Sequence, residues 1–317
     1  MTEFADYATM HVHLGELNQQ QRFEDAIELL QGALEQFPDH VLANSYNLAY
    51  FCCFTKEYDK GIKALQYGLD HGVWFGYFTF MDDMWAPYKE FEQFEQIEAA
   101  CEERRQEAQK HARPELVTLT PSGYSDEKAY PLLIALHGGG SNMQELEDNW
   151  KSAKLEKEFV VALLQSSQVA DADGFAWMDF ELAKKEITDA YQAVVEKYSI
   201  KAGETIIGGF SSGGRISLAI ALDGALSVQG FIALCPRKPE NYSLENVRRA
   251  RQRGVRGTIL TNEMDGAVPV QKEMAEAFES EGLPCEFIVT PNVGHWFPKD
   301  FGAQVDKAID HIRKQQT

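Results

Sequence analysis

The sequence lacks a surplus of positive charge. It contains 30 Lys and Arg against 49 Asp and Glu, and its formal net charge is −19 at pH 7. Nucleic acids and anionic membrane surfaces attract proteins through basic faces, so this composition argues against both as partners. The simplest consequence of the acidity is solubility.

Long apolar runs and a secretory leader are also missing. Residues 1–20 contain no basic segment followed by an apolar core, and no run of about 18 apolar residues occurs in the chain. We therefore expect no membrane span. The five cysteines are scattered and odd in number. They fit neither a disulfide framework nor a metal-binding cluster, so a reducing, cytoplasmic setting is the expected one.

The first third of the chain has the pattern of helices, with an internal repeat at an offset of 35 residues. Arg22–Leu30 aligns with Glu57–Leu65, and in each copy an aromatic residue is followed three positions later by a small one. This pattern resembles the second helix of a tetratricopeptide repeat. The preceding helices are expected at Ala5–Asn18 and Val41–Thr55. Two such units are too few to be stable alone, so other residues must cover their ends.

Two further stretches of this region are candidates for that cover. Val73–Trp85 is dense in aromatic residues and predicts a buried connector. Tyr88–His111 predicts one long helix, because apolar residues recur along one face with charges elsewhere. Those residues are Phe91, Phe94, Ile97 and Cys101.

The pattern changes at Arg113-Pro114, and from there strands and helices alternate. Strand candidates are Glu115–Thr120, Pro131–Leu136, Phe159–Leu164, Thr205–Gly209, Gly230–Leu234, Gly257–Leu260 and Cys285–Val289. Helix candidates are Asn142–Glu156, Ala183–Tyr198, Ser212–Leu222, Leu244–Arg253, Val268–Glu281 and Phe301–Lys314. Apolar strands separated by amphipathic helices predict an α/β domain over residues 114–317, with a mostly parallel sheet covered on both faces. An all-α domain over residues 1–113 precedes it.

The pentapeptide Gly209-Phe210-Ser211-Ser212-Gly213 lies between an apolar strand and a predicted helix. Gly-x-Ser-x-Gly in this context is typical of a nucleophile elbow, a sharp turn that projects the serine above the sheet. Ser211 is the candidate nucleophile. The amide of Ser212 lies at a helix N-terminus, where an anion is stabilised. The alternative is a glycine-rich turn with an idle serine.

A second glycine-rich turn, His137-Gly138-Gly139-Gly140, follows an earlier strand. It matches neither Gly-x-Gly-x-x-Gly nor a P-loop, which argues against a nucleotide site. Its position about 70 residues before the elbow fits an oxyanion loop, in which main-chain amides face a developing negative oxygen. Gly139 is the first choice for the loop donor and Gly138 the second, with Ser212 as the other donor. A plain turn is the alternative.

Two loops after later strands supply the remaining candidates. Asp265 follows a predicted strand and precedes a Val-Pro helix start, and such a carboxylate can orient an imidazole. Glu263 is its rival, and Asp265 could instead be a helix cap. His295 follows the last strand and comes third in the order Ser, Asp, His. An imidazole there can take a proton from Ser211 and return it to a leaving group.

On these motifs the chain from about residue 115 resembles an α/β-hydrolase of the dienelactone-hydrolase, carboxylesterase and phospholipase-like esterase group. The resemblance implies a serine esterase that acts through an acyl-enzyme on a small-molecule ester, with no metal or organic cofactor. Dienelactone hydrolases proper have a cysteine nucleophile, and Ser211 departs from that. The resemblance also implies that the segment Gly174–Asp179 lines the substrate pocket, with Trp177 as an apolar wall and Gly138 nearby. Packing in the core or at the surface is the alternative for Trp177.

Other activities fit the same residues. A serine peptidase or an acyl transferase would use the same three side chains and differ in acyl donor or acceptor. A protein-interaction module with a non-catalytic hydrolase scaffold is the alternative of a different class. The sequence leaves open whether the helical region caps the active site, forms a homodimer interface or binds a protein partner.

Overall fold

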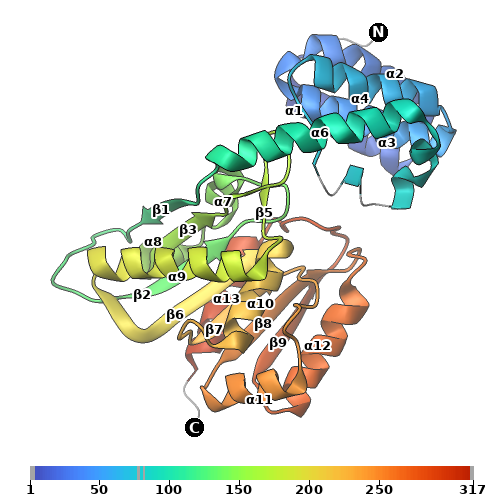
Figure 1. Cartoon of the computed structure of the whole chain (residues 1–317). Helices are drawn as coiled ribbons and strands as arrows, with labels where there is room; N and C mark the ends of the chain where they lie inside the picture. Colours follow the sequence, from blue (N-terminus) through green and yellow to red (C-terminus); the bar gives the residue numbers. More distant parts are fainter. Residues whose placement is uncertain (1–3, 77–78, 81–82, 315–317) are drawn as a thin grey trace. The chain divides into compact units, whose positions relative to one another are not determined.

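The computed structural model describes residues 4–76, 79–80 and 83–314 (Figure 1). The chain divides into two compact units, one of Met1–His111 with Val169–Ala172, the other of Ala112–Gln168 with Asp173–Thr317. The sequence predicts a boundary between residues 113 and 114 and a second domain without interruption. The four residues from Val169 belong to the helical unit because the Val169 N–H donates to Gln109 Oε1 at 3.0 Å and the Ala172 N–H to the Trp74 carbonyl at 3.4 Å.

The helical unit contains helices where the sequence predicts them. α1 begins at the N-cap Asp6, whose carboxylate accepts a hydrogen bond from the Thr9 N–H at 2.7 Å. The buried residues recur at helical spacing on α2 and α4, the two helices of the internal repeat. The resemblance to a tetratricopeptide repeat stays a prediction. The first four helices along the chain are α1 (Tyr7–Gln19), α2 (Phe23–Gln36), α3 (Val41–Thr55) and α4 (Tyr58–Asp70).

The helix predicted over Tyr88–His111 begins later than expected. Tyr88 lies in the 3₁₀ segment η2 (Asp83–Glu90), and α6 spans Glu92–His111. Pro87 lacks an N–H group and interrupts regular helix. The Tyr88 hydroxyl donates to the Ala49 carbonyl at 2.7 Å, and a Cβ on Gly61 would lie 1.8 Å from the hydroxyl oxygen. Gly61 is therefore the small residue that lets this tyrosine pack against the repeat.

The aromatic connector is buried in the part that the structure describes. Trp74, Phe75, Phe80 and Trp85 are at most 7% exposed, whereas Tyr77 and Phe78 lie outside the described residues. The Trp85 ring lies 5.3 Å from the ring of Tyr46 on α3 and 6.5 Å from that of Phe94 on α6. Phe94, Ile97 and Cys101 are buried on α6. These aromatic contacts bury the connector against α3 and α6.

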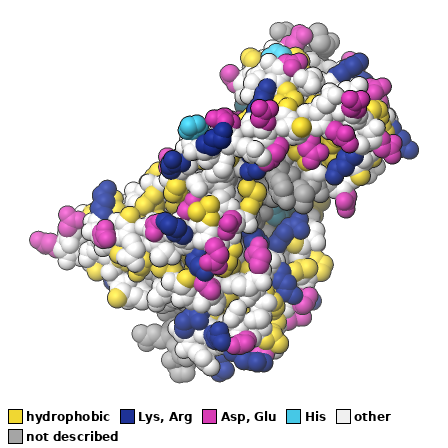
Figure 2. Space-filling view, viewed as in Figure 1, with side chains coloured by type: hydrophobic (Ala, Val, Ile, Leu, Met, Phe, Trp, Pro, Cys, Tyr) yellow, Lys and Arg dark blue, Asp and Glu magenta, His cyan; other side chains and the backbone are white. Residues whose placement is uncertain are grey.

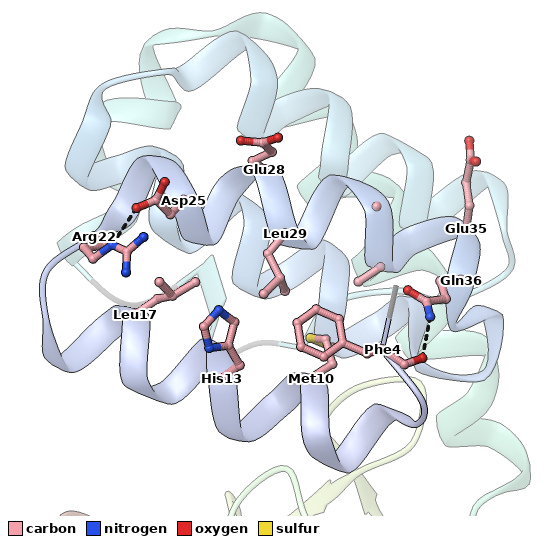
Figure 3. A pocket seen from close by; sticks show the side chains of 12 residues that line it. Phe4, Met10, His13, Leu17, Arg22, Asp25, Glu28, Leu29, Glu35 and Gln36 are labelled. Atoms are coloured by element: carbon pink, nitrogen blue, oxygen red, sulfur yellow. Dashed lines mark hydrogen bonds and ion pairs between the residues drawn. The ribbon is translucent and has the colours of Figure 1, made fainter. Parts of the chain in front are cut away.

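A groove of about 700 Å³ lies between α1 and α2. Figure 3 shows Leu17, Leu29 and Met10 between the two helices, whereas Glu28 and Glu35 point away from them. Arg22 at the edge of the groove forms an ion pair with Asp25 at 2.6 Å. The cap, dimer and partner roles of the helical region stay predictions.

The second unit is built on a seven-stranded sheet with the order β1-β3-β2-β6-β7-β8-β9 (Figure 1). β1 is antiparallel to β3, and all other pairs are parallel. This confirms the predicted mostly parallel sheet. A separate two-stranded sheet joins β4 (Gln168–Val169) and β5 (Phe175–Ala176). The main strands are β1 (Glu115–Leu119), β2 (Tyr130–Leu136), β3 (Val160–Gln165), β6 (Ile200–Phe210), β7 (Gly230–Leu234), β8 (Arg256–Asn262) and β9 (Cys285–Thr290).

Helices cover both faces of this sheet because successive side chains of a strand point to opposite faces. On β2, Leu132 and Ile134 join one buried cluster, while Leu133 and Ala135 join the other. The first cluster includes residues of α9 (Phe180–Lys197), α10 (Ser212–Asp223), α11 (Leu244–Gln252) and α12 (Val268–Ser280). The second includes residues of α7 (Met143–Asn149), α8 (Ala153–Glu158) and α13 (Phe301–Arg313). This double cover confirms the α/β class.

One predicted helix, Asn142–Glu156, is two helices in the structure. α7 ends before Trp150, whose side chain is 2% exposed in the second cluster. The Ser152 hydroxyl then accepts a hydrogen bond from the Leu155 N–H at 3.2 Å and starts α8.

On the face drawn in Figure 2, acidic side chains are interspersed with basic ones. In the described part of the chain, no helix has both the length and the apolar character that a membrane crossing requires.

Candidate active site

Ser211 occupies a strained turn between β6 and α10. Its φ is 53° and its ψ is −111°, outside the regions that L-residues favour. A Cβ on Gly209 would lie 2.3 Å from the Gly213 carbonyl carbon, and a Cβ on Gly213 would lie 2.3 Å from the His137 carbonyl oxygen. Only glycine fits at both positions. The Ser211 N–H donates to the Leu234 carbonyl at 2.8 Å, which anchors the turn to β7.

Three side chains from separate loops form one hydrogen-bonded chain. His295 Nε2 lies 2.8 Å from Ser211 Oγ, and His295 Nδ1 lies 2.5 Å from Asp265 Oδ2. The carboxylate can only accept, so Nδ1 carries the proton and Nε2 accepts from the serine hydroxyl. The side chain of His295 is 46% exposed and that of Asp265 is 2% exposed. The exposed imidazole thus lies between a buried carboxylate and the serine.

The His295 imidazole and the Ala267 N–H donate to the Asp265 carboxylate. Burial alone would raise the pKa of Asp265, but hydrogen bonds from His295, the Ala267 N–H and the Cys235 thiol together lower it below its usual value. The Ala267 N–H lies 2.7 Å from Asp265 Oδ1. The rival carboxylate, Glu263, instead accepts a hydrogen bond from the Asn292 N–H at 3.0 Å. The structure therefore brings Asp265, not Glu263, to the imidazole.

The profile of the phospholipase/carboxylesterase family of α/β-hydrolases matches residues 124–315, more than half of the chain. The chain belongs to this family. A solved structure from Bacillus cereus ATCC 10987, titled as an uncharacterized protein, is 24% identical with a TM-score of 0.54 and covers 97% of this chain and 98% of its own. That likeness concerns the fold alone.

Other solved structures resemble this phospholipase/carboxylesterase-family chain more weakly. Esterase PE8 is 16% identical with a TM-score of 0.48, over 62% of this chain and 97% of its own. A phospholipase/carboxylesterase from Dyadobacter fermentans DSM 18053 is 17% identical with a TM-score of 0.47, over the same shares. No curated protein matches the sequence.

Main-chain amides of this family member lie unpaired near the elbow. In the loop after β2, the Gly140 N–H donates to the Phe175 carbonyl at 2.8 Å and the Ser141 N–H to the Gly138 carbonyl at 3.4 Å. The N–H groups of Gly138, Gly139 and Ser212 have no acceptor among the described residues. Gly139 is exposed, whereas Gly138 is buried with its Cα against the Phe210 ring. Exposure therefore favours Gly139 over Gly138 as a donor to a bound substrate.

His137, the first residue of this loop, is buried and holds the loop in place through two hydrogen bonds, a role that the sequence analysis did not recognise. Its Nδ1 lies 2.6 Å from the Gly138 carbonyl oxygen, and its Nε2 accepts from the Ser166 N–H at 3.1 Å. These partners fix the neutral tautomer with the proton on Nδ1. Burial lowers the pKa of His137 to about 4. A histidine directly before three glycines is visible in the sequence, but the sequence does not show that its side chain is buried.

Trp177 packs beneath the loop. The resemblance implies that it forms an open apolar wall of the substrate pocket, and it does not. Its side chain is 1% exposed, and its Nε1–H donates to the His137 carbonyl at 3.0 Å. Its ring lies 5.0 Å from the His137 ring. A side chain with so little exposed surface has almost none to offer a ligand. The core-packing alternative applies to Trp177.

Exposed apolar side chains instead flank the imidazole and the carboxylate. Trp296 is 53% exposed and Met264 is 70% exposed, and they are the chain neighbours of His295 and Asp265. The Trp296 ring meets the Phe210 ring edge-on at 5.9 Å. The sequence analysis missed both residues, although each adjoins a predicted site residue. Each leaves apolar side-chain surface open to solvent at a position adjacent in sequence to a candidate site residue.

Cys235, Asp265 and His295 are the group of potential metal ligands among the described residues, with ligand atoms within 4.8 Å of one another. These groups already have partners in the protein: His295 Nδ1 lies 2.5 Å from Asp265 Oδ2, and Cys235 Sγ accepts a hydrogen bond from Asn262 Nδ2 at 3.5 Å. Burial raises the pKa of the Cys235 thiol, which disfavours the thiolate that a metal would need. The arrangement suits proton transfer better than metal binding.

Proposed function

We propose that the protein is a serine hydrolase that cleaves carboxylic esters of small molecules. The observation that carries the proposal is the hydrogen-bonded chain from Ser211 through His295 to Asp265 at a strained elbow. Membership in the phospholipase/carboxylesterase family supports the same reaction class. Nucleophile, base and orienting carboxylate have the mutual geometry that acyl transfer requires.

The first step is attack on the ester carbonyl. Ser211 Oγ forms a bond to the carbonyl carbon while its proton passes to His295 Nε2 across the 2.8 Å hydrogen bond. Asp265 holds the ring and stabilises the imidazolium that forms. The carbonyl oxygen becomes negative and is stabilised by the N–H groups of Gly139 and Ser212. Each donor of this kind lowers the barrier by about 3 kcal/mol.

The second step breaks the ester bond. The tetrahedral species collapses, the alcohol oxygen takes the proton from His295, and the acyl group remains on Ser211. Water then gives a proton to His295 and attacks the acyl carbon, and the acid leaves as the serine regains its proton. No step needs a redox partner or a metal.

The exposed apolar residues adjacent in sequence to His295 and Asp265 support a proposal for the substrate class. Trp296 and Met264 offer apolar contact area that is open to solvent. An ester with an apolar acyl or alcohol group would bury part of that area, at about 25 cal/mol per Å². This favours an ester with an apolar acyl or alcohol group as the substrate. The five cysteines are scattered and odd in number, which favours a reducing compartment, and we propose the cytoplasm.

A fluorophosphonate probe tests the proposal against the non-catalytic scaffold. Folded wild-type protein should be labelled on Ser211, and Ser211→Ala should not be labelled. Absence of labelling in folded protein would favour the scaffold. Hydrolysis of p-nitrophenyl esters compared with aminoacyl anilides then separates an esterase from a peptidase, and added alcohols as acceptors reveal an acyl transferase.

A further inference from the structure

A buried amide lies between the loop that carries Asp265 and the loop that carries His295. Asn262 is the last residue of β8 and is 0% exposed. Its main-chain carbonyl accepts a hydrogen bond from the Asp265 N–H at 2.9 Å, which closes the turn that presents the carboxylate. Its side chain contacts the loop after β9. One residue therefore links both loops.

The contact with the second loop brackets His295. The Trp296 N–H donates to the Gly294 carbonyl at 2.8 Å, so His295 is the central residue of a three-residue γ-turn. Asn262 Nδ2 donates to the Gly294 carbonyl at 2.7 Å and to the Trp296 carbonyl at 2.6 Å. Both ends of the turn are thus held by one NH₂ group. Carbonyl oxygens only accept, which fixes the orientation of the amide.

The other half of the amide shows why this residue is polar. Asn262 Oδ1 is buried and has no donor among the described residues. A buried acceptor without a partner is destabilising, and an apolar side chain of similar size would avoid that cost. The cost of the unpaired oxygen is therefore offset by the two hydrogen bonds through which the amide N–H groups hold the His295 turn. The remaining support of the exposed imidazole comes from its bonds to Ser211 and Asp265 and from the Phe210 ring at 5.0 Å.

We infer that Asn262 is the positioning residue for His295. It fixes the γ-turn so that the imidazole reaches Ser211 and Asp265 at the same time. The inference rests on the proposed function, because it assigns to Asn262 a role in the activity of Ser211 and His295. Asn262 acts through the turn and does not touch the ester.

The test compares Asn262→Ala and Asn262→Leu with the wild type, using a p-nitrophenyl ester. Leucine keeps the volume and removes both donors, so it remains informative if alanine fails to fold. Both variants should lose about 30- to 100-fold in kcat, because small misplacement of a reacting group costs about that much. KM should change by less than about threefold, since no substrate contact is removed.

Gln304→Ala is a matched control at the base of the same loop. Gln304 is 5% exposed, its Nε2 donates to Thr290 Oγ1 at 2.9 Å and Asp300 Oδ1 at 3.0 Å, and its Oε1 is also buried without a donor. The control removes an equally buried amide without touching the His295 turn. It should lower the melting temperature as Asn262→Ala does, yet keep kcat within about threefold of the wild type.

A double variant separates positioning from general stability. Asn262→Ala should have no further effect on the residual activity of His295→Ala, because there is no imidazole left to position. Independent losses in the double variant, or equal losses of kcat in the Asn262 and Gln304 variants, would overturn the inference. If wild-type protein is not labelled on Ser211 by fluorophosphonate, the proposed function fails. If wild type is labelled and active but the Asn262 variants keep full kcat, only the positioning role fails.

Discussion

Replacement of Asp265 by asparagine tests the electrostatic side of the site. Asp265 Oδ2 faces His295 Nδ1 at 2.5 Å, and Oδ1 faces the Ala267 N–H at 2.7 Å. Asparagine has one oxygen, so it can serve only one of these two donors well. If the oxygen keeps the Ala267 N–H, the NH₂ group faces Nδ1 and requires the imidazole to carry its proton on Nε2. That tautomer cannot accept the proton of Ser211.

The expected loss in Asp265→Asn is therefore large. We expect kcat/KM to fall by about 10³- to 10⁴-fold, which corresponds to about 4–5.5 kcal/mol of activation free energy. The assay is hydrolysis of a p-nitrophenyl ester, with the melting temperature as the check on folding. Glu263→Gln is the control, because Glu263 holds the Asn292 N–H and does not reach the imidazole. It should stay within about threefold of the wild type. A loss below about tenfold in Asp265→Asn, or equal losses in both variants, would refute this reasoning.

Three further predictions concern pH, packing and substrate. Burial lowers the pKa of His137 in the folded protein to about 4, from 6.5 in the unfolded chain. The stabilisation from the neutral His137 ring is therefore complete above pH 6.5, and it is lost as the pH falls toward 4 because the unfolded chain takes up the proton first. The free energy of unfolding in urea should fall by about 3 kcal/mol over that range from this group, and His137→Gln should remove that part of the pH dependence; an unchanged profile would contradict the buried neutral ring. Gly213→Ala places a methyl group against the His137 carbonyl oxygen and should lower the melting temperature and cost about 1–3 kcal/mol, whereas a wild-type melting curve would show that the turn is roomier than described. Trp296→Ala should raise KM for long-chain p-nitrophenyl esters by about three- to tenfold and leave acetate hydrolysis nearly unchanged; equal effects on both chain lengths would rule out an apolar contact.

The sequence predicts the fold well where structure depends on local pattern. Apolar strands alternate with amphipathic helices, and each strand of the seven-stranded sheet has a counterpart among the predicted strands. The local pattern predicts one helix over Asn142–Glu156. The break at Trp150 depends on burial of this side chain in the second hydrophobic cluster, which the local pattern does not reveal. The start of α6 depends likewise on the insertion of Tyr88 beside Gly61, which no local pattern reveals.

The candidate site shows the same division. Ser211 could be found because the elbow imposes a local spacing of glycines, and Asp265 and His295 because of their order after strands. The residues that hold these three side chains in place could not be found in this way. His137, Cys235 and Asn262 contact residues distant in sequence, and the sequence carries no trace of such pairs. The resemblance predicts that Trp177 lines a pocket, but its side chain is buried under the loop, where its indole N–H donates to the His137 carbonyl.

The central claim is that Ser211 forms a covalent acyl-enzyme with the help of His295. The most direct measurement is mass spectrometry of protein quenched early in the reaction with p-nitrophenyl acetate, followed by peptide mapping. The account predicts an acetyl group on the peptide that contains Ser211, formed in a burst with the first nitrophenol and absent from Ser211→Ala. Turnover with no acyl group on Ser211, or with the group on another residue, would contradict it.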